Sequence, residues 1–241
     1  MAIALVAVAG SGALLAAGAW WLLTSPRFAV ARVESGPYRF TTQADLDLAL
    51  RSALGHNIWT LGTADLAAAC ARLPWVRAVH LRRRVPDTVT VELEEWRPLV
   101  GVASARSADL EVLIGDGRVL PWPAHLQPPG LPVLVGAALD RSDPAAPRLD
   151  AGTVVPVMAV LDALVATGFE AAYPVDFIRL TDRGVVLELE RRGGSLVLGD
   201  EEFAPRLRRY LLARDRIPSG AHVDLRFQDR ITFETPQSAG H

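Results

Sequence analysis

Adjacent acidic residues are the first candidates for chemistry in this chain. They occur as Glu94 and Glu95, and as Asp200, Glu201 and Glu202, and a carboxylate pair can act as general acid and base when its protonation is suitably tuned. The first pair belongs to an alternating strand pattern, and the second set precedes a helical pattern. Acids are expected there on a solvated strand face and at the positive end of a helix dipole. We therefore predict no acid–base site at either place.

A nucleophilic or metal site would need cysteine, serine or histidine at defined spacings. The single cysteine, Cys70, follows three alanines in a helical pattern, which indicates a small buried side chain. No Gly-x-Ser-x-Gly motif occurs, and the five histidines are scattered without metal-ligand spacing. We expect no enzyme activity, no metal site and no cofactor.

The charge pattern gives no general attraction to nucleic acid. The formal net charge is −2, and all 25 basic residues are arginines. Arg82, Arg83 and Arg84 form a short basic run, and an acidic run at residues 92–95 follows on the next predicted strand. This arrangement favours cross-strand charge pairs over a nucleic-acid surface.

The elements that hold these residues begin with an uncharged run at residues 2–23, in which Ser11 is the sole polar side chain. As a helix it would be about 33 Å long, close to the hydrocarbon thickness of a bilayer. Trp20 and Trp21 lie at its end, where tryptophan favours the membrane interface. We predict a short N-terminus and a transmembrane helix over residues 1–26, with Trp20 and Trp21 at the interface.

This run has two other interpretations. A dinucleotide-binding turn would need a small third residue after Gly10 and Gly12, but Leu15 stands there. A cleaved secretory signal could end at residues 17–19, but the run has no basic start and continues beyond that point. An uncleaved anchor therefore fits better.

The charge bias around the anchor does not fix its orientation. No basic residue precedes the run, whereas Arg27, Arg32 and Arg39 follow it, which by the positive-inside rule points away from export. Large domains are translocated largely regardless of such charges.

Residues 27–98 predict a domain of order β-α-α-β-β. A strand at 28–34 precedes a helix capped by Thr41 or Thr42 and closed by Gly55; Thr63 is expected to cap a second helix. Two strands then meet at residues 85–87, with Thr88 pointing outward on the second. The apolar positions expected on the helices are Leu46, Leu48, Leu50 and Leu54, then Leu66, Ala69, Cys70 and Leu73. A three-stranded sheet covered on one face by two helices would follow.

Residues 99–235 predict a mixed α+β domain with an extended, antiparallel-rich sheet. A hairpin turns at Asp116 and Gly117, a strand at 131–136 follows, and residues 140–153 are expected to form a loop. A helix at 154–165 closed by Gly168 precedes a meander at 175–198 and a second helix with Phe203, Leu207, Tyr210 and Leu211 on one face. The last two strands are expected at 221–227 and 230–235, the final one at or near an edge, and a disordered tail at 236–241.

The motifs in these elements resemble one known family. The stretches "LPWVRAVHLRRRVPDTVTVELEEWRPLV", "GHNIWTL", "VLIGDGRVLPW" and "HVDLRFQDRITFE" look like those of the FtsQ/DivIB bacterial division proteins. The resemblance covers the chain from the anchor to about residue 235. It implies one membrane span, a POTRA domain and an FtsQ-type β domain. Because the family's cytoplasmic tail is missing here, contacts made through that tail are not carried over.

The resemblance also implies a function. A protein of this family is a non-catalytic scaffold of the divisome, anchored in the cytoplasmic membrane at the division septum, with most of its chain on the outer side. Its implied partners are coiled-coil proteins of the FtsB and FtsL type and septal synthases of the FtsW and FtsI type, with no nucleic acid and no small-molecule substrate. The alternative is a POTRA-containing factor for outer-membrane protein assembly or secretion.

An edge strand can bind a partner through its backbone, because its outer N–H and C=O groups are unpaired. The resemblance places this edge in the final strands. The alternative for Phe227 and Phe233 is that their rings fill the core. The expected partner-binding residues are Arg226, Phe227, Ile231, Thr232, Phe233 and Glu234.

Overall fold

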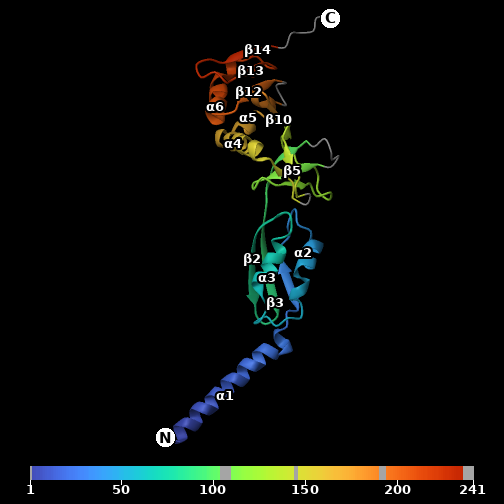
Figure 1. The fold of residues 1–241 in the computed structure, drawn as a ribbon, viewed down its shortest axis with the longest axis vertical. Coiled ribbons are helices and arrows are strands. Elements are labelled where there is room, and N and C mark those ends of the chain that lie inside the picture. Colours follow the sequence, from blue (N-terminus) through green and yellow to red (C-terminus); the bar gives the residue numbers. More distant parts are fainter. Residues whose placement is uncertain (1, 104–109, 144–145, 190–193, 236–241) are drawn as a thin grey trace. The chain divides into compact units, whose positions relative to one another are not determined.

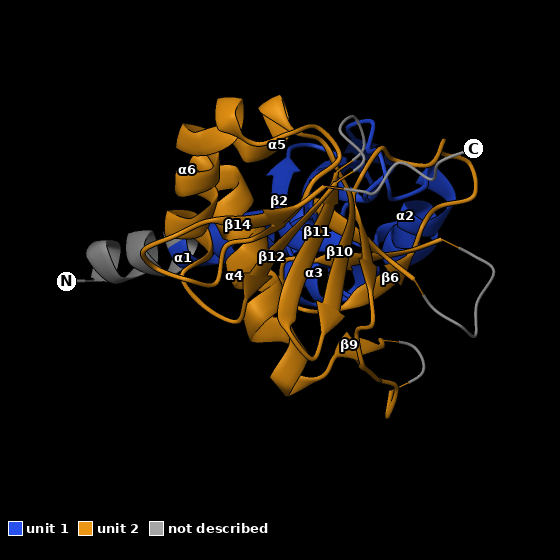
Figure 2. Cartoon of the chain, turned by 90° about the horizontal axis from the view of Figure 1, so that it is seen from above, with its two compact units in different colours: residues 1–96 blue, residues 97–241 orange. Residues whose placement is uncertain are grey.

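The structure, a computed structural model, describes residues 2–103, 110–143, 146–189 and 194–235, with backbone alone for residues 2–11. The tail expected at 236–241 lies outside the described residues. Figure 1 shows the course of the chain, and Figure 2 colours its two compact units, Met1–Trp96 and Arg97–His241.

The first unit starts with a long helix, α1 (Ala2–Thr24), and a short 3-10 turn, η1 (Pro26–Phe28). Trp20 and Trp21, at the end of α1, are 70% and 51% exposed. Among the residues described with side chains, which begin at Gly12 in this helix, no helix is long and apolar enough to cross a membrane.

A small sheet with two helices follows, and the predicted β-α-α-β-β order is confirmed. Its elements are β1 (Arg32–Ser35), α2 (Gln43–Leu50), η2 (Arg51–Ala53), α3 (Thr63–Cys70), β2 (Val76–Arg84) and β3 (Thr88–Glu95). The strands lie in the order β1-β3-β2, with β1 parallel and β2 antiparallel to β3. β2 is therefore an edge of this sheet.

The core of this unit joins the helices to the sheet. Leu46 and Leu50 of α2 are buried, but Leu48 and Leu54 were wrongly predicted on the same face and are 64% and 49% exposed. Leu48 lies two residues from each buried leucine, on the opposite side of the helix. The chain tightens into η2 after Leu50, so Ala53 is buried in place of Leu54.

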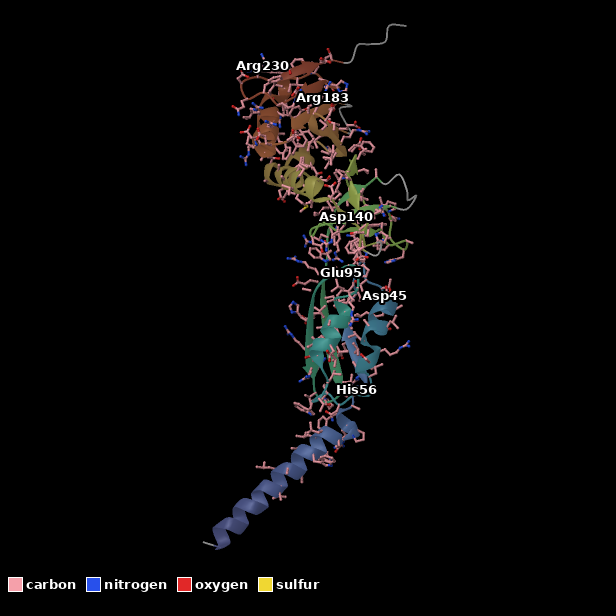
Figure 3. The ribbon with its side chains drawn as sticks, viewed as in Figure 1. Asp45, His56, Glu95, Asp140, Arg183 and Arg230 are labelled. Carbon is pink, nitrogen blue, oxygen red and sulfur yellow. The ribbon has the colours of Figure 1, made fainter. Side chains whose placement is uncertain are left out.

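The start of α2 was predicted more accurately than that of α3. The Thr42 hydroxyl accepts the N–H of Asp45 at 3.2 Å and caps α2; Figure 3 labels Asp45 at this end of the unit. In α3 the cap is Gly62, and Thr63 is the first helical residue. A Cβ on Gly62 would lie 2.7 Å from the Asp65 carboxylate, so a side chain at this position would require that carboxylate to move.

Two further predictions in this unit are wrong. The first strand was expected at 28–34, but the 3-10 turn η1 extends to Phe28 and β1 begins only at Arg32. The second concerns Thr88. It was predicted to point to solvent, but it is buried at the start of β3. Its hydroxyl donates to the carboxylate of Asp87 at 3.0 Å, which provides the polar group with a partner.

The second unit is built on a nine-stranded mixed sheet in the order β14-β13-β12-β11-β10-β7-β4-β5-β6. Its strands are β4 (Pro98–Val102), β5 (Glu111–Ile114), β6 (Val119–Pro121), β7 (Val133–Val135), β10 (Val175–Thr181), β11 (Gly184–Leu189), β12 (Ser195–Gly199), β13 (His222–Asp224) and β14 (Thr232–Glu234). The predicted meander is confirmed as β10-β11-β12. Parallel pairs join β7 to β4 and β10, and β12 to β13.

Three helices pack on this sheet: α4 (Ala151–Thr167), α5 (Phe169–Ala172) and α6 (Phe203–Ala213), the last extended by η3 (Arg214–Arg216). Figure 2 shows them gathered on one side of the sheet. Gly168 closes α4 with φ 63°, as predicted, but the helix begins three residues earlier than expected. The Asp150 carboxylate caps it there by accepting the N–H groups of Gly152 and Thr153. The segment expected as a loop also holds a short pair, β8 (Leu139–Asp140) and β9 (Arg148–Leu149).

The helix α6 connects the parallel strands β12 and β13. Phe203, Leu207 and Tyr210 are buried in the core, as predicted. Arg206 was not predicted there, yet it is 6% exposed; its guanidinium donates to the carbonyl of Leu198. The helix therefore fixes the end of β12 through a buried hydrogen bond.

Candidate functional site

The last described strand, β14, forms one edge of the nine-stranded sheet. It pairs antiparallel with β13, so that Phe233 lies opposite Val223. All three residues of β14 are exposed, and no other described strand pairs with its outer side. The final strand is thus at the edge, as the sequence predicts.

Hydrogen bonds on the inner side of β13 establish its register. The N–H of Ser195 donates to the carbonyl of Ala221 at 3.3 Å, and the N–H of Leu225 donates to the carbonyl of Val197 at 3.0 Å. The odd-numbered residues around β13 therefore turn their backbone groups toward β12.

The backbone N–H and C=O groups of successive residues in a strand point to opposite sides. The N–H and C=O groups of His222 and Asp224 therefore point toward β14. Their partners in the register are Glu234 and Thr232, respectively. Those two residues thus make the ladder with β13. The N–H and C=O of Phe233 point away from the sheet.

The aromatic side chains at this edge are only partly buried. Phe233 is 45% and Phe227 is 39% exposed, and the Arg230 guanidinium lies 4.6 Å from the centre of the Phe227 ring. Ile231, by contrast, packs against the hydrophobic core. Phe233 therefore leaves an apolar ring partly exposed at the edge, close in sequence to the core contact of Ile231.

An ion pair shapes the chain where it leaves β13. The Arg226 guanidinium donates to the Asp224 carboxylate, with a shortest distance of 2.7 Å, and the Arg226 N–H donates to the same carboxylate at 3.0 Å. Hydrogen bonding from Arg226 lowers the pKa of Asp224, and Asp224 raises the pKa of Arg226. The pair is therefore charged at neutral pH.

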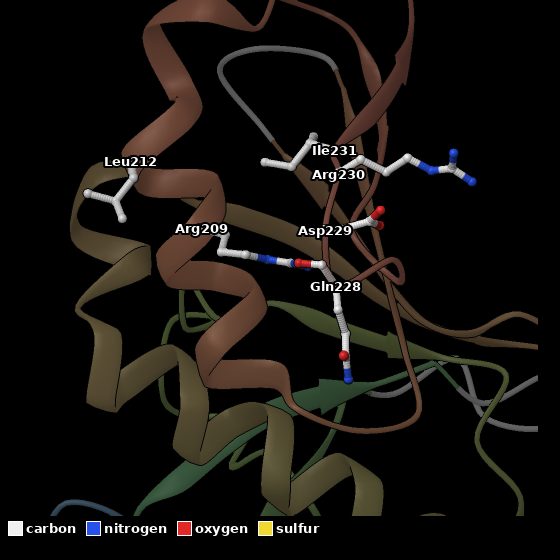
Figure 4. Close-up of a pocket in the computed structure, with 6 residues that line it drawn as sticks. All are labelled: Arg209, Leu212, Gln228, Asp229, Arg230 and Ile231. Carbon is white, nitrogen blue, oxygen red and sulfur yellow. The ribbon is translucent and has the colours of Figure 1, made fainter.

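The helix α6 supports the connection between the two last strands. One guanidinium nitrogen of Arg209 donates to the carbonyl of Gln228, and another donates to the carbonyl of Leu225 at 2.7 Å. Beside it a cavity of about 230 Å³ opens between α6 and this connection, shown in Figure 4. Its lining residues are Arg209, Leu212, Gln228, Asp229, Arg230 and Ile231. Leu212, at 87% exposed, leaves an apolar side chain at the cavity.

The structure places the predicted partner-binding residues on one continuous segment. Thr232, Phe233 and Glu234 form β14. The other three were expected inside strands but lie in the connection between β13 and β14: they are Arg226, Phe227 and Ile231. Sequence reasoning missed Arg209 and Leu212, although both occur in a helix that was predicted.

Three of the acidic residues singled out for chemistry have structural partners. Glu94 lies 3.6 Å from His80 across the sheet. The Glu95 carboxylate accepts the backbone N–H groups of residues 39–41 at 2.8, 2.9 and 2.6 Å. Glu202 lies 3.6 Å from Arg206. Each of these three carboxylates therefore has a partner in the described structure.

Cysteine and histidine were the other residue types considered for a reactive or metal-binding site. Cys70 is fully buried, and burial raises the pKa of its thiol, which disfavours the nucleophilic thiolate. Within the described ranges no cluster of histidine, cysteine and acidic residues could hold a metal ion.

The basic run on β2 forms ion pairs across the small sheet. Arg82 lies 4.0 Å from Glu92 on β3, and Arg84 lies 3.2 Å from Glu34 on β1. Arg83 instead donates to a backbone carbonyl. Cross-strand pairing was the predicted role, and β1 supplies a partner that the sequence pattern did not indicate.

Comparison with known proteins gives the family. Residues 29–96 match the POTRA domain, FtsQ-type, family model. The cell division protein FtsQ of Myxococcus fulvus is 32% identical over 219 residues, which cover 88% of this chain and 73% of that protein. The FtsQ proteins of Neisseria meningitidis and Allochromatium vinosum are 27% and 28% identical, over 90% and 92% of this chain and 86% and 85% of their own lengths. From its β-α-α-β-β domain through to its edge strand, the chain belongs to the FtsQ family of cell division proteins.

Proposed function

We propose that this protein is a non-catalytic scaffold of the bacterial divisome, which binds an extended segment of a partner beside β14. The observation that carries the proposal is the outward direction of the Phe233 N–H and C=O. An added strand would satisfy these groups, and its alternate side chains would select the partner.

The surface beside β14 gives the partner segment a chemical character. Apolar side chains of the segment would contact Phe233, and one could enter the cavity beside Leu212. Arg209 and Arg230 line that cavity with a single acid, Asp229. A segment that combines apolar and acidic residues therefore fits this edge.

The family resemblance narrows the class of partner. Coiled-coil division proteins of the FtsB and FtsL type are the proposed donors of the added strand. Contacts with septal synthases of the FtsW and FtsI type are proposed for the POTRA domain, where the β2 edge offers a second surface.

The proposal includes a membrane anchor made by α1. Residues 2–23 carry no charge, and 23 helical residues extend about 34 Å, enough to cross the hydrocarbon core. The two units would then lie on the outer side of the cytoplasmic membrane, at the septum. Trp20 and Trp21 would lie at the membrane interface.

The test is the substitution Phe233→Pro in the full-length protein, co-expressed with its coiled-coil partners. Proline removes the outward N–H without removing a hydrogen bond to β13. We expect affinity for the partner to fall about tenfold or more, a change of about 1.4 kcal/mol. Binding in detergent or nanodiscs gives the measurement.

Two controls distinguish the loss of the backbone N–H from the loss of the ring and from unfolding of the protein. Phe233→Ala keeps the N–H and removes the ring, so it should weaken binding less than proline does. Thermal unfolding should show that both variants remain folded. Unchanged affinity in a folded Phe233→Pro variant would refute strand addition at β14.

If the protein were instead an outer-membrane assembly factor, it would bind different partner proteins. Mass spectrometry of proteins that co-purify with the chain from native membranes should identify small coiled-coil division proteins and septal synthases. Outer-membrane barrels or secreted clients in their place would favour the assembly role.

A further inference from the structure

The loop that carries Asn57 caps the end of α1. The side-chain amide of Asn57 donates to the carbonyls of Leu22 and Leu23, each at 2.9 Å, and its oxygen accepts the N–H of Trp59 at 2.9 Å. The last carbonyls of a helix have no partner within the helix. A loop from the globular part of the unit therefore supplies partners for the last turn of α1.

Aromatic rings continue this junction. The N–H of Ile58 donates to the carbonyl of Phe28 at 2.7 Å. The Phe28 ring meets Trp21 at 5.7 Å and Trp59 at 6.1 Å between ring centres, in edge-on arrangements. A row of three rings thus runs from the last turn of α1 onto the loop.

The loop also exposes large apolar side chains. Trp59 is 44% and Leu54 is 49% exposed. The rings of Trp21, Phe28 and Trp59 form what we call the junction patch, and Leu54 is exposed on the same loop. Arg27 is exposed next to Phe28 and adds a positive charge. Figure 3 labels His56, from the same loop, at the end of the unit where α1 joins it.

From this geometry we infer that the loop at residues 54–60 docks on the bilayer surface, with Trp59 and Leu54 in the headgroup region. The inference rests on the proposed membrane span of α1. Lipid is the occupant because the patch continues the tryptophans at the end of α1, and because the Asn57 cap holds the loop at the depth of that helix end. Tryptophan favours this region, and arginine favours anionic headgroups.

The experiment places a fluorescent probe at single cysteines in the full chain, in a Cys70→Ala background. The sites are Thr60→Cys on the loop, Ala44→Cys near Asp45 at the other end of the unit, and Leu15→Cys within α1. The protein is reconstituted in vesicles of phosphatidylethanolamine and phosphatidylglycerol that contain lipids with a quencher either near the headgroup or in the middle of the acyl chain.

We expect headgroup quenchers to quench the probe at Thr60 at least about twofold more than the probe at Ala44. Acyl-chain quenchers should quench the probe at Leu15. Adding Leu54→Ser and Trp59→Ser should lower quenching at Thr60 and leave Leu15 unchanged, with circular dichroism confirming the fold.

Two outcomes would overturn the inference, and they are distinguishable. Equal quenching at Thr60 and Ala44, with Leu15 quenched by the acyl-chain probes, would refute docking while the membrane span stands. An unquenched probe at Leu15 would refute the proposed span, and the docking inference with it.

Discussion

At the scale of single residues, Asp224 is the last residue of β13 and forms an ion pair with Arg226. Its carboxylate binds Arg226 through both backbone and side chain. A side chain that accepts a nearby backbone N–H competes with the strand ladder, which explains why β13 ends at Asp224. The alternation of apolar and polar residues predicted a longer strand, because such a pattern carries no information about side-chain hydrogen bonds to the backbone.

The lowered pKa of Asp224 leads to a prediction about pH. A carboxylate whose pKa is lower in the folded protein stabilises it above the ordinary aspartate pKa of about 3.9, and this contribution is lost as the pH falls through the folded value. Asp224→Asn should therefore reduce the free energy of unfolding near pH 7, and the difference from the natural protein should shrink as the pH falls from 7 into the acidic range. Urea unfolding across this range measures it; a constant difference would contradict the ion-pair explanation.

Buried arginine is the residue-scale feature that sequence patterns missed. Arg206 occurs at a position that an apolar helix face would give to leucine, and hydropathy alone assigns arginine to solvent. The carbonyl of Leu198 that it binds comes from another element. Only the packing of α6 on β12 brings the two together, so periodicity could not indicate it.

At the scale of elements, the turn before β11 depends on a close approach between strands. Gly184 has φ 88°, and a Cβ there would lie 2.3 Å from the carbonyl carbon of Gly199. The sequence predicts a turn at this glycine. It does not predict the approach, which depends on the register of β11 with β12.

Gly184→Ala should therefore destabilise the second unit by about 3 kcal/mol or more, from left-handed strain and overlap together. Gly168→Ala is the matched control, since φ is 63° and nothing lies within 4 Å of a Cβ there. It should cost about 1 kcal/mol. Chemical denaturation measures both, and equal losses would show that the contact with Gly199 is unimportant.

Sequence patterns identified long periodic elements better than short ones. The order of the first domain and the β10-β11-β12 meander follow from clear alternation and turn residues. The pair β8 and β9 has two residues in each strand, too few to show any period. The exposed Leu48 shows the other limit, because a leucine-rich helix has more apolar positions than one face can bury.

At the scale of the whole molecule, each unit has its own hydrophobic core. The cluster that contains Leu46, Leu66 and Val89 lies entirely in the first unit, and the cluster that contains Leu187 and Leu207 lies entirely in the second. Separate cores predict separate stability.

Glu95→Gln tests this separation, because glutamine replaces one of the oxygens that accept the N–H groups of residues 39–41 by a donor. It should destabilise the first unit by about 1–3 kcal/mol. Protection against hydrogen exchange should fall there and not in the second unit, and Gly184→Ala should show the reverse. Glu92→Gln is the control, since Glu92 has a 4.0 Å surface ion pair. A loss of protection in both units would refute independent folding.

The unpaired side of β14 also limits how many partner segments can bind there at one time. A strand ladder accepts one neighbour on each side, and β13 already occupies the inner side of β14. Two segments that recognise this edge must therefore exclude each other, whether both come from division proteins or one comes from a second copy of this chain. The two segments would then compete for β14, and their relative concentrations and affinities would determine which one is bound.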